Sequence, residues 1–359
     1  MREPEIHAVV MAGGSGTRFW PASRRQRPKQ FLQVAGEESL IAATVARLEG
    51  LVPLERVLVV TAASQAELVR EELPDLPGDN ILAEPEARNT APCVAWAAHA
   101  LAERSANDEH AVQVVLPADH VIQPTEAFQA TIRAAAQDAL ASQGLLTFGI
   151  VPTFAAEGFG WIQGGERAAD VDGHAVHVAE RFVEKPDRAT AEGFLASGNF
   201  YWNSGMFVWS ARAIAAAVEQ HMPEAPPAFA KLAQGTSLAD VYAELRAEPV
   251  DIAIFQKADN VRVMPVDYRW NDVGSWAALP DVLPTDGDGH VVAGGTRLVA
   301  HESKDCVVHG TAGKVIALAG VEGLVVVATD DAVLVCPKDR AQDVKAIVER
   351  LGQDAPDFL

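Results

Sequence analysis

Short apolar runs that alternate with helical stretches are the feature that most limits how this chain can fold. Ile6–Ala12 (IHAVVMA), Arg56–Ala62 (RVLVVTA) and Leu145–Ile150 are typical of buried strands. Between such runs the apolar residues recur at helical spacing, as in Thr125–Ser142. Strands that are apolar on both faces must be covered by helices on both sides. The sequence therefore predicts an α/β fold with a Rossmann-like, mostly parallel mixed sheet flanked by helices.

The pattern changes after about Pro284. From there on, short β-rich runs such as Val315–Ala319 and Leu324–Ala328 alternate with Gly and Asp turns, and Arg340–Leu351 has the spacing of a final helix. We therefore expect residues 1–284 to form one domain and residues 285–359 to form a small β-rich domain closed by that helix. The helix is expected to dock on the first domain or on a second subunit.

The charge balance excludes several classes of partner. The chain has 29 basic and 49 acidic residues, which gives a formal net charge of −20. Such a protein is not expected to bind nucleic acid or an anionic membrane. The N-terminus lacks the apolar core of a signal peptide, and no apolar stretch is long enough to predict a membrane span, so we expect a cytoplasmic protein. The three cysteines are far apart and predict neither a disulfide framework nor a zinc ribbon.

A glycine-rich loop with many basic residues follows the first predicted strand. Gly13, Gly14 and Gly16 allow backbone N–H groups to approach an anion closely. Five basic residues come within the next dozen or so positions, namely Arg18, Arg24, Arg25, Arg27 and Lys29. The loop is neither a Walker A motif nor a complete dinucleotide-binding fingerprint. In so acidic a chain, it predicts a local phosphate-binding site.

Several motifs, in a fixed order, carry a resemblance to a known family. The segments are GGSGTRFWPASR at 13–24, PKQF at 28–31, EPEARNTAP at 84–92, LPADH at 116–120, FVEKPD at 182–187, WNSGMF at 202–207 and WNDVGSW at 270–276. In these segments the chain resembles the sugar-1-phosphate nucleotidylyltransferases and, more narrowly, the mannose-1-phosphate guanylyltransferases. The resemblance covers about residues 6 to 280. The tail is also similar to the family's C-terminal region, for which the family implies a short left-handed β-helix.

The resemblance implies a reaction that needs no general base. A phosphate oxygen of mannose 1-phosphate attacks the α-phosphorus of GTP, and pyrophosphate leaves to give GDP-mannose. Since the second pKa of a phosphate monoester lies near about 6, the nucleophile is already mostly dianionic at neutral pH. The protein must instead supply cations and hold two anions in position. A divalent cation such as Mg²⁺ is implied as cofactor, and a homodimer is expected.

The resemblance also implies roles for individual residues. The catalytic cations are Arg18, Lys29 and Lys185. The nucleotide is bound by Gly13, Gly14, Ser15, Gly16, Thr17, Arg88, Asn89 and Thr90. The sugar phosphate is bound by Gly160, Glu184, Lys185, Asn203 and Asp251. The metal is bound by Asp119 and Asp272. Asp119 is also favoured by its position, because it follows an apolar strand and ligands of open α/β sheets bind outside the carboxyl ends of strands.

Simpler readings stay open for several of these residues. Asn89 or Thr90 is also suited to cap the helix that follows it. Glu184 and Lys185 also fit a surface ion pair before a proline turn, and Asn203 fits a buried turn. His120 is expected to pack or position rather than to bind a metal. Arg24, Arg25 and Arg27 fit phosphate binding and solvent exposure equally well.

Three other functions compete with this interpretation. The same reaction with glucose 1-phosphate and UTP, dTTP or ATP would use similar motifs. A non-catalytic regulatory relative would be expected to have lost some of Arg18, Lys29, Asp119, Lys185 and Asp272, and all five are present. A nicotinamide-dependent oxidoreductase would need the complete dinucleotide fingerprint, which is absent.

Overall fold

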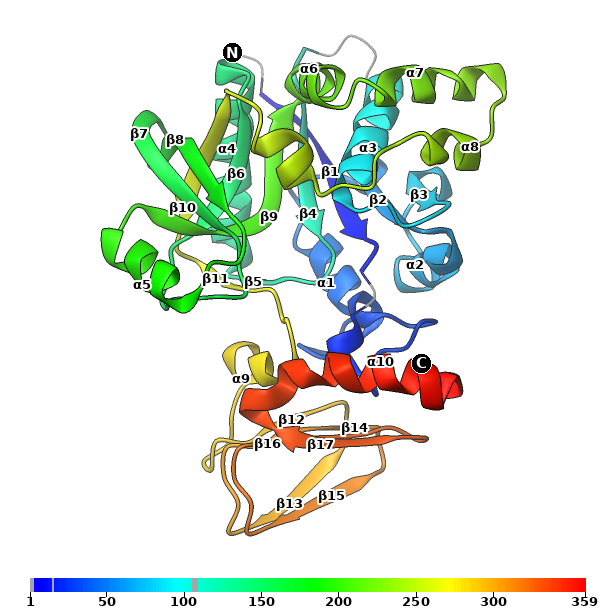
Figure 1. Ribbon diagram of the computed structural model, residues 1–359, viewed down its shortest axis with the longest axis vertical. Coiled ribbons are helices and arrows are strands. Elements are labelled where there is room, and N and C mark those ends of the chain that lie inside the picture. The colour runs from blue at the N-terminus through cyan, green and yellow to red at the C-terminus, as the bar shows by residue number, and fades with distance from the viewer. Residues whose placement is uncertain (1–2, 15, 105–108) are drawn as a thin grey trace.

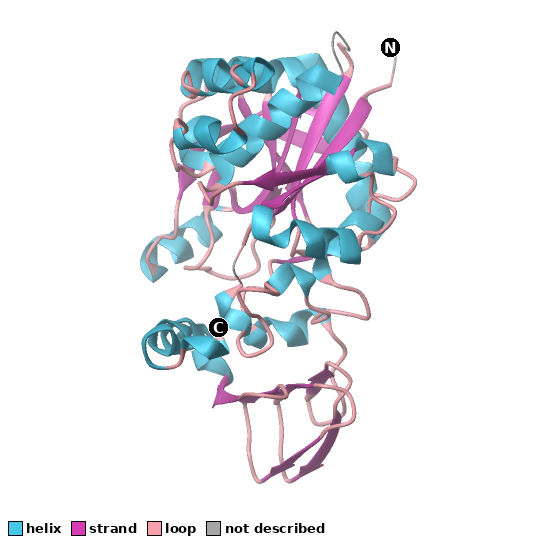
Figure 2. Cartoon of the chain, turned by 90° about the vertical axis from the view of Figure 1, so that its right-hand side faces the viewer, coloured by secondary structure: helices cyan, strands magenta, loops and turns pink. Residues whose placement is uncertain are grey.

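The computed structural model describes residues 3–14, 16–104 and 109–359. A layered α/β part lies at one end of an elongated molecule and a smaller β-rich part at the other, with the last helix, α10, between them (Figure 1). The view from the side shows the large sheet with helices on both of its faces (Figure 2).

The strands of the α/β part are short and mostly apolar. They are β1 (Glu5–Ala12), β2 (Val57–Ala62), β3 (Ile81–Glu84), β4 (Ala111–Pro117), β5 (Val121–Gln123), β6 (Leu145–Ile150), β7 (Trp161–Val171), β8 (His174–Val183), β9 (Phe200–Ser210), β10 (Val261–Val266) and β11 (Arg269–Asn271).

Helices connect these strands and close the chain. They are α1 (Leu40–Ala46), α2 (Ala66–Glu72), α3 (Thr90–Arg104), α4 (Thr125–Ser142), α5 (Arg188–Ser197), α6 (Ala211–His221), α7 (Ala225–Ala230), α8 (Leu238–Ala243), α9 (Leu279–Val282) and α10 (Val344–Asp354). In the described ranges, no helix is both long and apolar enough to cross a membrane.

The described strands of the α/β part form a nine-stranded sheet in the order β3-β2-β1-β4-β9-β6-β10-β8-β7. Strands β1 to β4 are mutually parallel, and β6 and β10 are parallel. Strand β9 runs antiparallel to β4, β6 and β7, and β8 runs antiparallel to β7 and β10. Only β8 and β9 therefore oppose the common direction, and the predicted mixed sheet flanked by helices is confirmed.

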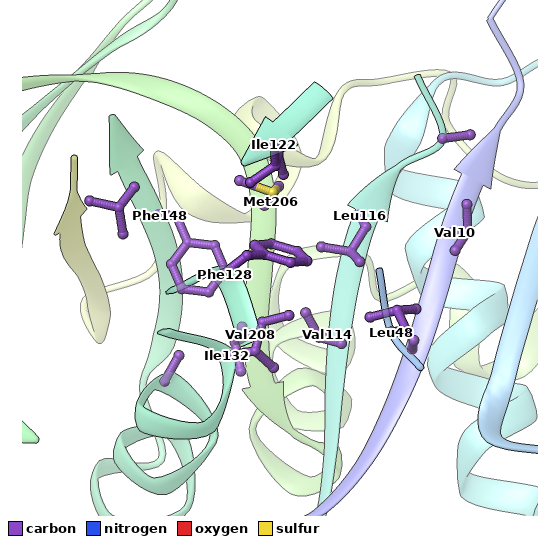
Figure 3. Close-up of a cluster of buried hydrophobic side chains, with 14 of the residues drawn as sticks. Val10, Leu48, Val114, Leu116, Ile122, Phe128, Ile132, Phe148, Met206 and Val208 are labelled. Atoms are coloured by element: carbon purple, nitrogen blue, oxygen red, sulfur yellow. The ribbon is translucent and has the colours of Figure 1, made fainter. Parts of the chain in front are cut away.

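The alternation of side chains along each strand explains why both faces are buried. In β1, Ala8 and Val10 belong to the core shared with α1 and α4, whereas Val9 belongs to the core shared with α3 and α6. Phe128 of α4 lies over the sheet among side chains of five strands and of the segment that follows α1 (Figure 3). The residues labelled around it are Val10, Leu48, Val114, Leu116, Ile122, Ile132, Phe148, Met206 and Val208.

The β-rich part winds as a parallel β-helix. Its strands are β12 (Val291–Ala293), β13 (Arg297–His301), β14 (Val307–Gly310), β15 (Val315–Ala319), β16 (Leu324–Ala328) and β17 (Val333–Pro337). Two parallel ladders and an isolated bridge place partners 18 positions apart, as in Val307 with Val325, Arg297 with Val315, and Lys304 with Glu322. The last strand, β17, pairs antiparallel with β16 instead of starting another coil. The tail is thus the expected β-rich fold.

One hydrophobic core joins the two parts. Phe19 and Trp20 of the glycine-basic loop share it with Trp276, with Val307 of the β-helix and with Val344 of α10. The Trp20 indole Nε1 donates a hydrogen bond to the backbone oxygen of Phe358 at 2.9 Å, and Trp276 Nε1 donates to the Trp20 carbonyl at 3.1 Å. The C-terminal part therefore supports the loop that carries Arg18 and Lys29.

Candidate active site

A cavity of about 530 Å³ opens at the carboxyl ends of β1, β3 and β4. Strand β9 runs the other way, so its first half reaches the same end of the sheet. Among the residues predicted from sequence, those that line this cavity are Gly13, Gly14, Arg88, Asn89, Thr90, Gly160, Glu184, Lys185, Asn203, Asp251 and Asp272. Ser15 lies outside the described residues. Gly16, Thr17, Arg18, Lys29 and Asp119 are described but do not line the cavity.

Lys29 ties the two predicted metal-binding aspartates together. The residue is 6% exposed, and Nζ donates to Asp119 Oδ2 at 2.7 Å and to the backbone carbonyl of Asp272 at 2.7 Å. Burial tends to raise the pKa of Asp119, but the charges of Lys29 and His120 hold it below its ordinary value. Burial raises the pKa of Asp272, and although Lys29 opposes this rise, the nearby charge of Asp119 adds to it. The site is therefore a buried ammonium beside two interacting carboxylates.

Gly16 sets the position of Lys29. Its backbone has φ of 57°, in the left-handed region that favours glycine. A Cβ at this position would lie 2.2 Å from the Lys29 Cβ and 2.7 Å from the Lys29 backbone nitrogen. No side chain fits between the two segments. The third glycine of the loop is thus needed for close backbone approach to Lys29.

The other basic residues of the loop differ in their surroundings. Arg18 is exposed, and its charge slightly opposes the rise that burial causes in the pKa of Asp272. Arg24 forms an ion pair with Asp331 at 2.9 Å, and Arg27 forms one with Glu72. Like Thr17, Arg24 and Arg25 line a second cavity of about 330 Å³ against α10. Arg24, Arg25 and Arg27 thus face the molecule's own acids or α10 rather than the central cavity.

The turn before α3 forms one wall of the central cavity. Asn89, with φ of 67°, accepts a hydrogen bond at Oδ1 from the Thr90 backbone N–H at 2.9 Å. Thr90 Oγ1 accepts one from the Val250 N–H at 2.8 Å. Arg88 donates to the Leu245 carbonyl and to Glu86. These residues hold the helix start and line the cavity at once, so the capping and binding interpretations are compatible.

Glu84, at the end of β3, is a cavity residue that sequence reasoning missed. The residue is 8% exposed, and Oε1 accepts a hydrogen bond from the Tyr242 hydroxyl at 3.2 Å. Burial raises the pKa of Glu84 to about 7, with the Tyr242 hydrogen bond opposing the shift. An acid directly after an apolar strand was the available signal, and it lies in the same motif as Arg88. A carboxyl that titrates near neutrality inside a cleft is a candidate functional group.

The opposite wall carries the predicted sugar-phosphate residues. Lys185 and Glu184 are exposed and form an ion pair at 3.1 Å on the rim, so the surface-pair interpretation and the cavity position both hold. Asn203 Nδ2 donates to Asp251 Oδ1 at 2.8 Å, and Asn203 Oδ1 accepts from the Gly205 N–H at 3.1 Å. Asp251 begins a short π-helix, Asp251–Phe255. Asn203 thus orients the Asp251 carboxylate.

Gly160 allows this wall to pack closely. A Cβ there would lie 3.1 Å from Glu184 Oε2 and 3.3 Å from the Asn203 Cβ. The neighbouring Phe159 packs against Trp202 and Trp270, with ring centroids 5.2 and 5.4 Å apart. This wall therefore presents the rings of Phe159 and Trp270 to the cavity beside Gly160.

Comparisons with known proteins agree with this geometry. A family model described as nucleotidyl transferase matches residues 7–288, and one described as a mannoseP isomerase/GMP-like beta-helix domain matches residues 286–351. An Escherichia coli protein named mannose-1-phosphate guanylyltransferase is 41% identical over 357 residues, which are 96% of this chain and 74% of that protein. The xanthan biosynthesis protein XanB of Xanthomonas campestris is 40% identical over 358 residues, covering 97% and 73%.

A solved structure is also similar over nearly the whole chain. It is the crystal structure of a Thermus thermophilus protein described as mannose-1-phosphate geranyltransferase. The two structures align with a TM-score of 0.87 and 37% sequence identity, over 97% of this chain and 99% of the other. Both the α/β part and the β-helix are therefore matched.

Proposed function

The chain belongs to the nucleotidyl transferase family, and on this premise we propose that it transfers GMP from GTP to α-D-mannose 1-phosphate. The products are GDP-mannose and pyrophosphate. The relative named mannose-1-phosphate guanylyltransferase supports this choice of substrates.

The contact of Lys29 with Asp119 and Asp272 is the observation that carries the proposal. Asp119 follows β4 and Asp272 follows β11, and Lys29 lies within hydrogen-bonding distance of both residues. The triphosphate and the sugar phosphate repel each other, so catalysis needs fixed positive charge where they meet. A buried lysine beside a carboxylate pair, at the edge of a cavity lined by glycine backbone, supplies that arrangement.

The protein's own groups position the reactants. Backbone N–H groups at Gly13 and Gly14, with the cations of Arg18 and Lys29, bind the triphosphate. Lys185 binds the phosphate of the sugar, and Glu184 and Asp251 accept hydrogen bonds from sugar hydroxyls. The phosphate oxygen of the sugar then attacks the α-phosphorus of GTP, in line with the departing pyrophosphate. No residue removes a proton from the nucleophile, because the phosphate is mostly dianionic at neutral pH.

The donor set fits a magnesium ion. Mg²⁺ is commonly bound by one or two carboxylates together with substrate phosphates and waters. Asp119 and Asp272 offer two carboxylates. Burial and, to a smaller extent, the charge of Asp119 raise the pKa of Asp272, and a divalent cation bound there would favour its ionised form. When bound there, Mg²⁺ supplies positive charge to the reacting phosphates.

Glu84 extends the proposal to the choice of base. Guanine presents two adjacent N–H donors on one edge, and a carboxylate is an acceptor that pairs with both. Uracil and thymine present one such donor, and adenine presents an amino group beside an acceptor. Glu84 lines the cavity close to Gly13, whose added Cβ would lie 3.7 Å from Glu84 Oε2. This position suits contact with the base of a nucleotide whose phosphates lie on the glycine loop.

The protein is further proposed to act in the cytoplasm as a homodimer, with the domain boundary at residues 284/285. Val333 and Val335 of β17 are 64% and 58% exposed, although they are β-branched apolar side chains on one strand. A second copy of the chain would cover such a surface. Light scattering on the wild type and on a Val333→Lys, Val335→Lys variant tests this. A monomeric wild type contradicts the dimer.

The test of the function is pyrophosphate release with Mg²⁺, measured for GTP, ATP, UTP and dTTP against mannose 1-phosphate and glucose 1-phosphate. We expect the highest kcat/KM with GTP and mannose 1-phosphate, loss of turnover with EDTA, and a large loss in Lys185→Ala. If a different pair is preferred, the assignment of substrates is wrong, but the proposed type of reaction still holds. A folded protein with no turnover for any pair would favour a non-catalytic relative.

A further inference from the structure

His120 lies on the wall of the central cavity beside the predicted metal site, and the roles assigned so far do not use it. It follows Asp119 directly after β4. Its backbone carbonyl accepts a hydrogen bond from Arg47 Nη2 at 2.8 Å. The backbone at this point is thus held from the far side of the cavity wall.

Trp270 determines which tautomer His120 adopts. The Trp270 indole Nε1 and His120 Nδ1 are 3.2 Å apart, and the two rings meet edge to face with centroids 5.4 Å apart. An indole N–H can only donate, so Nδ1 must be the acceptor. The proton of the neutral imidazole is therefore on Nε2. None of the described residues forms a hydrogen bond with that Nε2.

The position of Trp270 is itself well defined. Strand β11 pairs with β5, which places Trp270 opposite Ile122. Phe159 packs against the indole ring from the sugar side of the cavity. Because Trp270 is fixed by a strand pair and an aromatic contact, it presents its N–H to His120 in one orientation.

We propose that His120 binds the sugar 1-phosphate, donating a hydrogen bond from Nε2 to an oxygen of its phosphate group, and that Trp270 is the positioning residue that keeps the proton on Nε2. The inference rests on the proposed function. His120 lies between the carboxylates near which the phosphates meet and the aromatic surface of Phe159 and Trp270. A neutral donor at this point orients the nucleophilic phosphate without adding a further charge to it.

The experiment measures the KM of mannose 1-phosphate, the KM of GTP and the Mg²⁺ dependence in three variants. His120→Phe keeps an aromatic ring and removes the donor, and His120→Gln restores an N–H at a similar distance from the backbone. Trp270→Phe keeps the aromatic contact and removes the indole donor. Trp209→Phe is the matched control, because it deletes an indole hydrogen bond to Gln113 in the core.

We expect His120→Phe to raise the KM of mannose 1-phosphate by about ten-fold to a hundred-fold, the range for losing a hydrogen bond to a charged group. The KM of GTP and the Mg²⁺ dependence stay within about two-fold of the wild-type values, as expected where a substitution removes no contact. His120→Gln recovers most of the loss. Trp270→Phe raises the same KM by a smaller factor, and the double variant with His120→Phe is no worse than His120→Phe alone. Trp209→Phe lowers the melting temperature without changing this KM.

Two results would overturn the inference. One is an unchanged KM for mannose 1-phosphate in His120→Phe. The other is an equal rise in the KM of GTP or in the Mg²⁺ concentration needed for activity. Either rise would place His120 at the nucleotide or the metal. Calorimetric titration of mannose 1-phosphate gives the same comparison without turnover. Wild-type turnover with the proposed substrates is measured independently, so failure of the proposed function is distinguishable from failure of this inference.

Discussion

Replacing Gly16 with alanine tests whether close packing of the loop positions Lys29. A new Cβ would lie 2.2 Å from the Lys29 Cβ, whereas ordinary contacts begin at 3.4 Å, so one segment must move by at least about 1.2 Å. A displacement of about 1 Å at a positioned catalytic group can cost on the order of a hundred-fold in rate. The left-handed backbone, with φ of 57°, adds strain of roughly 1–2 kcal/mol.

The expected result is a fall in kcat/KM for GTP of about a hundred-fold, measured by pyrophosphate release. The melting temperature should fall by only a few degrees, since roughly 1 kcal/mol shifts a large domain by about 2–4 °C. Gly198→Ala is the matched control. Gly198 also has a positive φ, of 74°, but a Cβ there meets nothing within 4 Å. It should show the modest loss of stability with full activity.

The reasoning would be refuted if Gly16→Ala stayed folded and kept kcat/KM within about three-fold of wild type, well short of the loss expected for a displaced group. In that case Lys29 either moves without consequence or is not a catalytic group. A fall in activity of equal size in Gly198→Ala would also refute it, because backbone strain alone would then explain the effect.

Three further expectations follow from the same contacts. Lys29→Met should abolish pyrophosphate release and raise the pKa of Asp119, because the lysine charge holds that pKa down in the wild type. NMR titration of the Asp119 carboxylate measures the second effect, and an unchanged pKa contradicts it. Burial raises the pKa of Glu84 to about 7, so the KM of GTP should rise as the pH falls below 7 and the carboxylate takes a proton. Glu84→Gln should give a higher KM that does not rise in this way. A parallel pH profile of the KM in the two proteins counts against contact with the base. Deleting residues 356–359 removes the backbone oxygen that accepts a hydrogen bond from Trp20. We expect a several-fold loss of kcat/KM for GTP with the α/β part still folded. Full activity would show that this contact does not support the loop.

Most of the α/β fold could be predicted from local patterns, because strands buried on both faces are apolar throughout. The reversal of β9 could not, since WNSGMF and FVW carry no sign of strand direction. The β-helix was expected only by resemblance. Its 18-residue spacing, as between Val307 and Val325, is present in the sequence. The period is hidden because the first ladder, in which Val291 pairs with Val307, has a spacing of 16 residues instead.

The candidate site was predicted in part. The glycine loop, Asp119 and Lys185 stand out from their motifs. Glu84 did not, although it ends β3, because an acid beside a turn looks like any surface carboxylate until burial is known. The resemblance singled out Lys29 in the basic loop, but it left open whether Arg24 and Arg27 bind phosphate or face solvent. Their partners, Asp331 and Glu72, lie far along the chain.

The sequence by itself determined the local structure and the chemical types available. Apolar runs form strands, glycines permit left-handed turns, and the motifs place cations and carboxylates at the ends of those elements. Only the tertiary structure decided which of these groups meet. Lys29 reaches Asp119 and Asp272 across separations of 90 and 243 residues. Such contacts depend on how strands are ordered and how the C-terminal part supports the loop. These are properties of packing between distant segments, which no local pattern encodes.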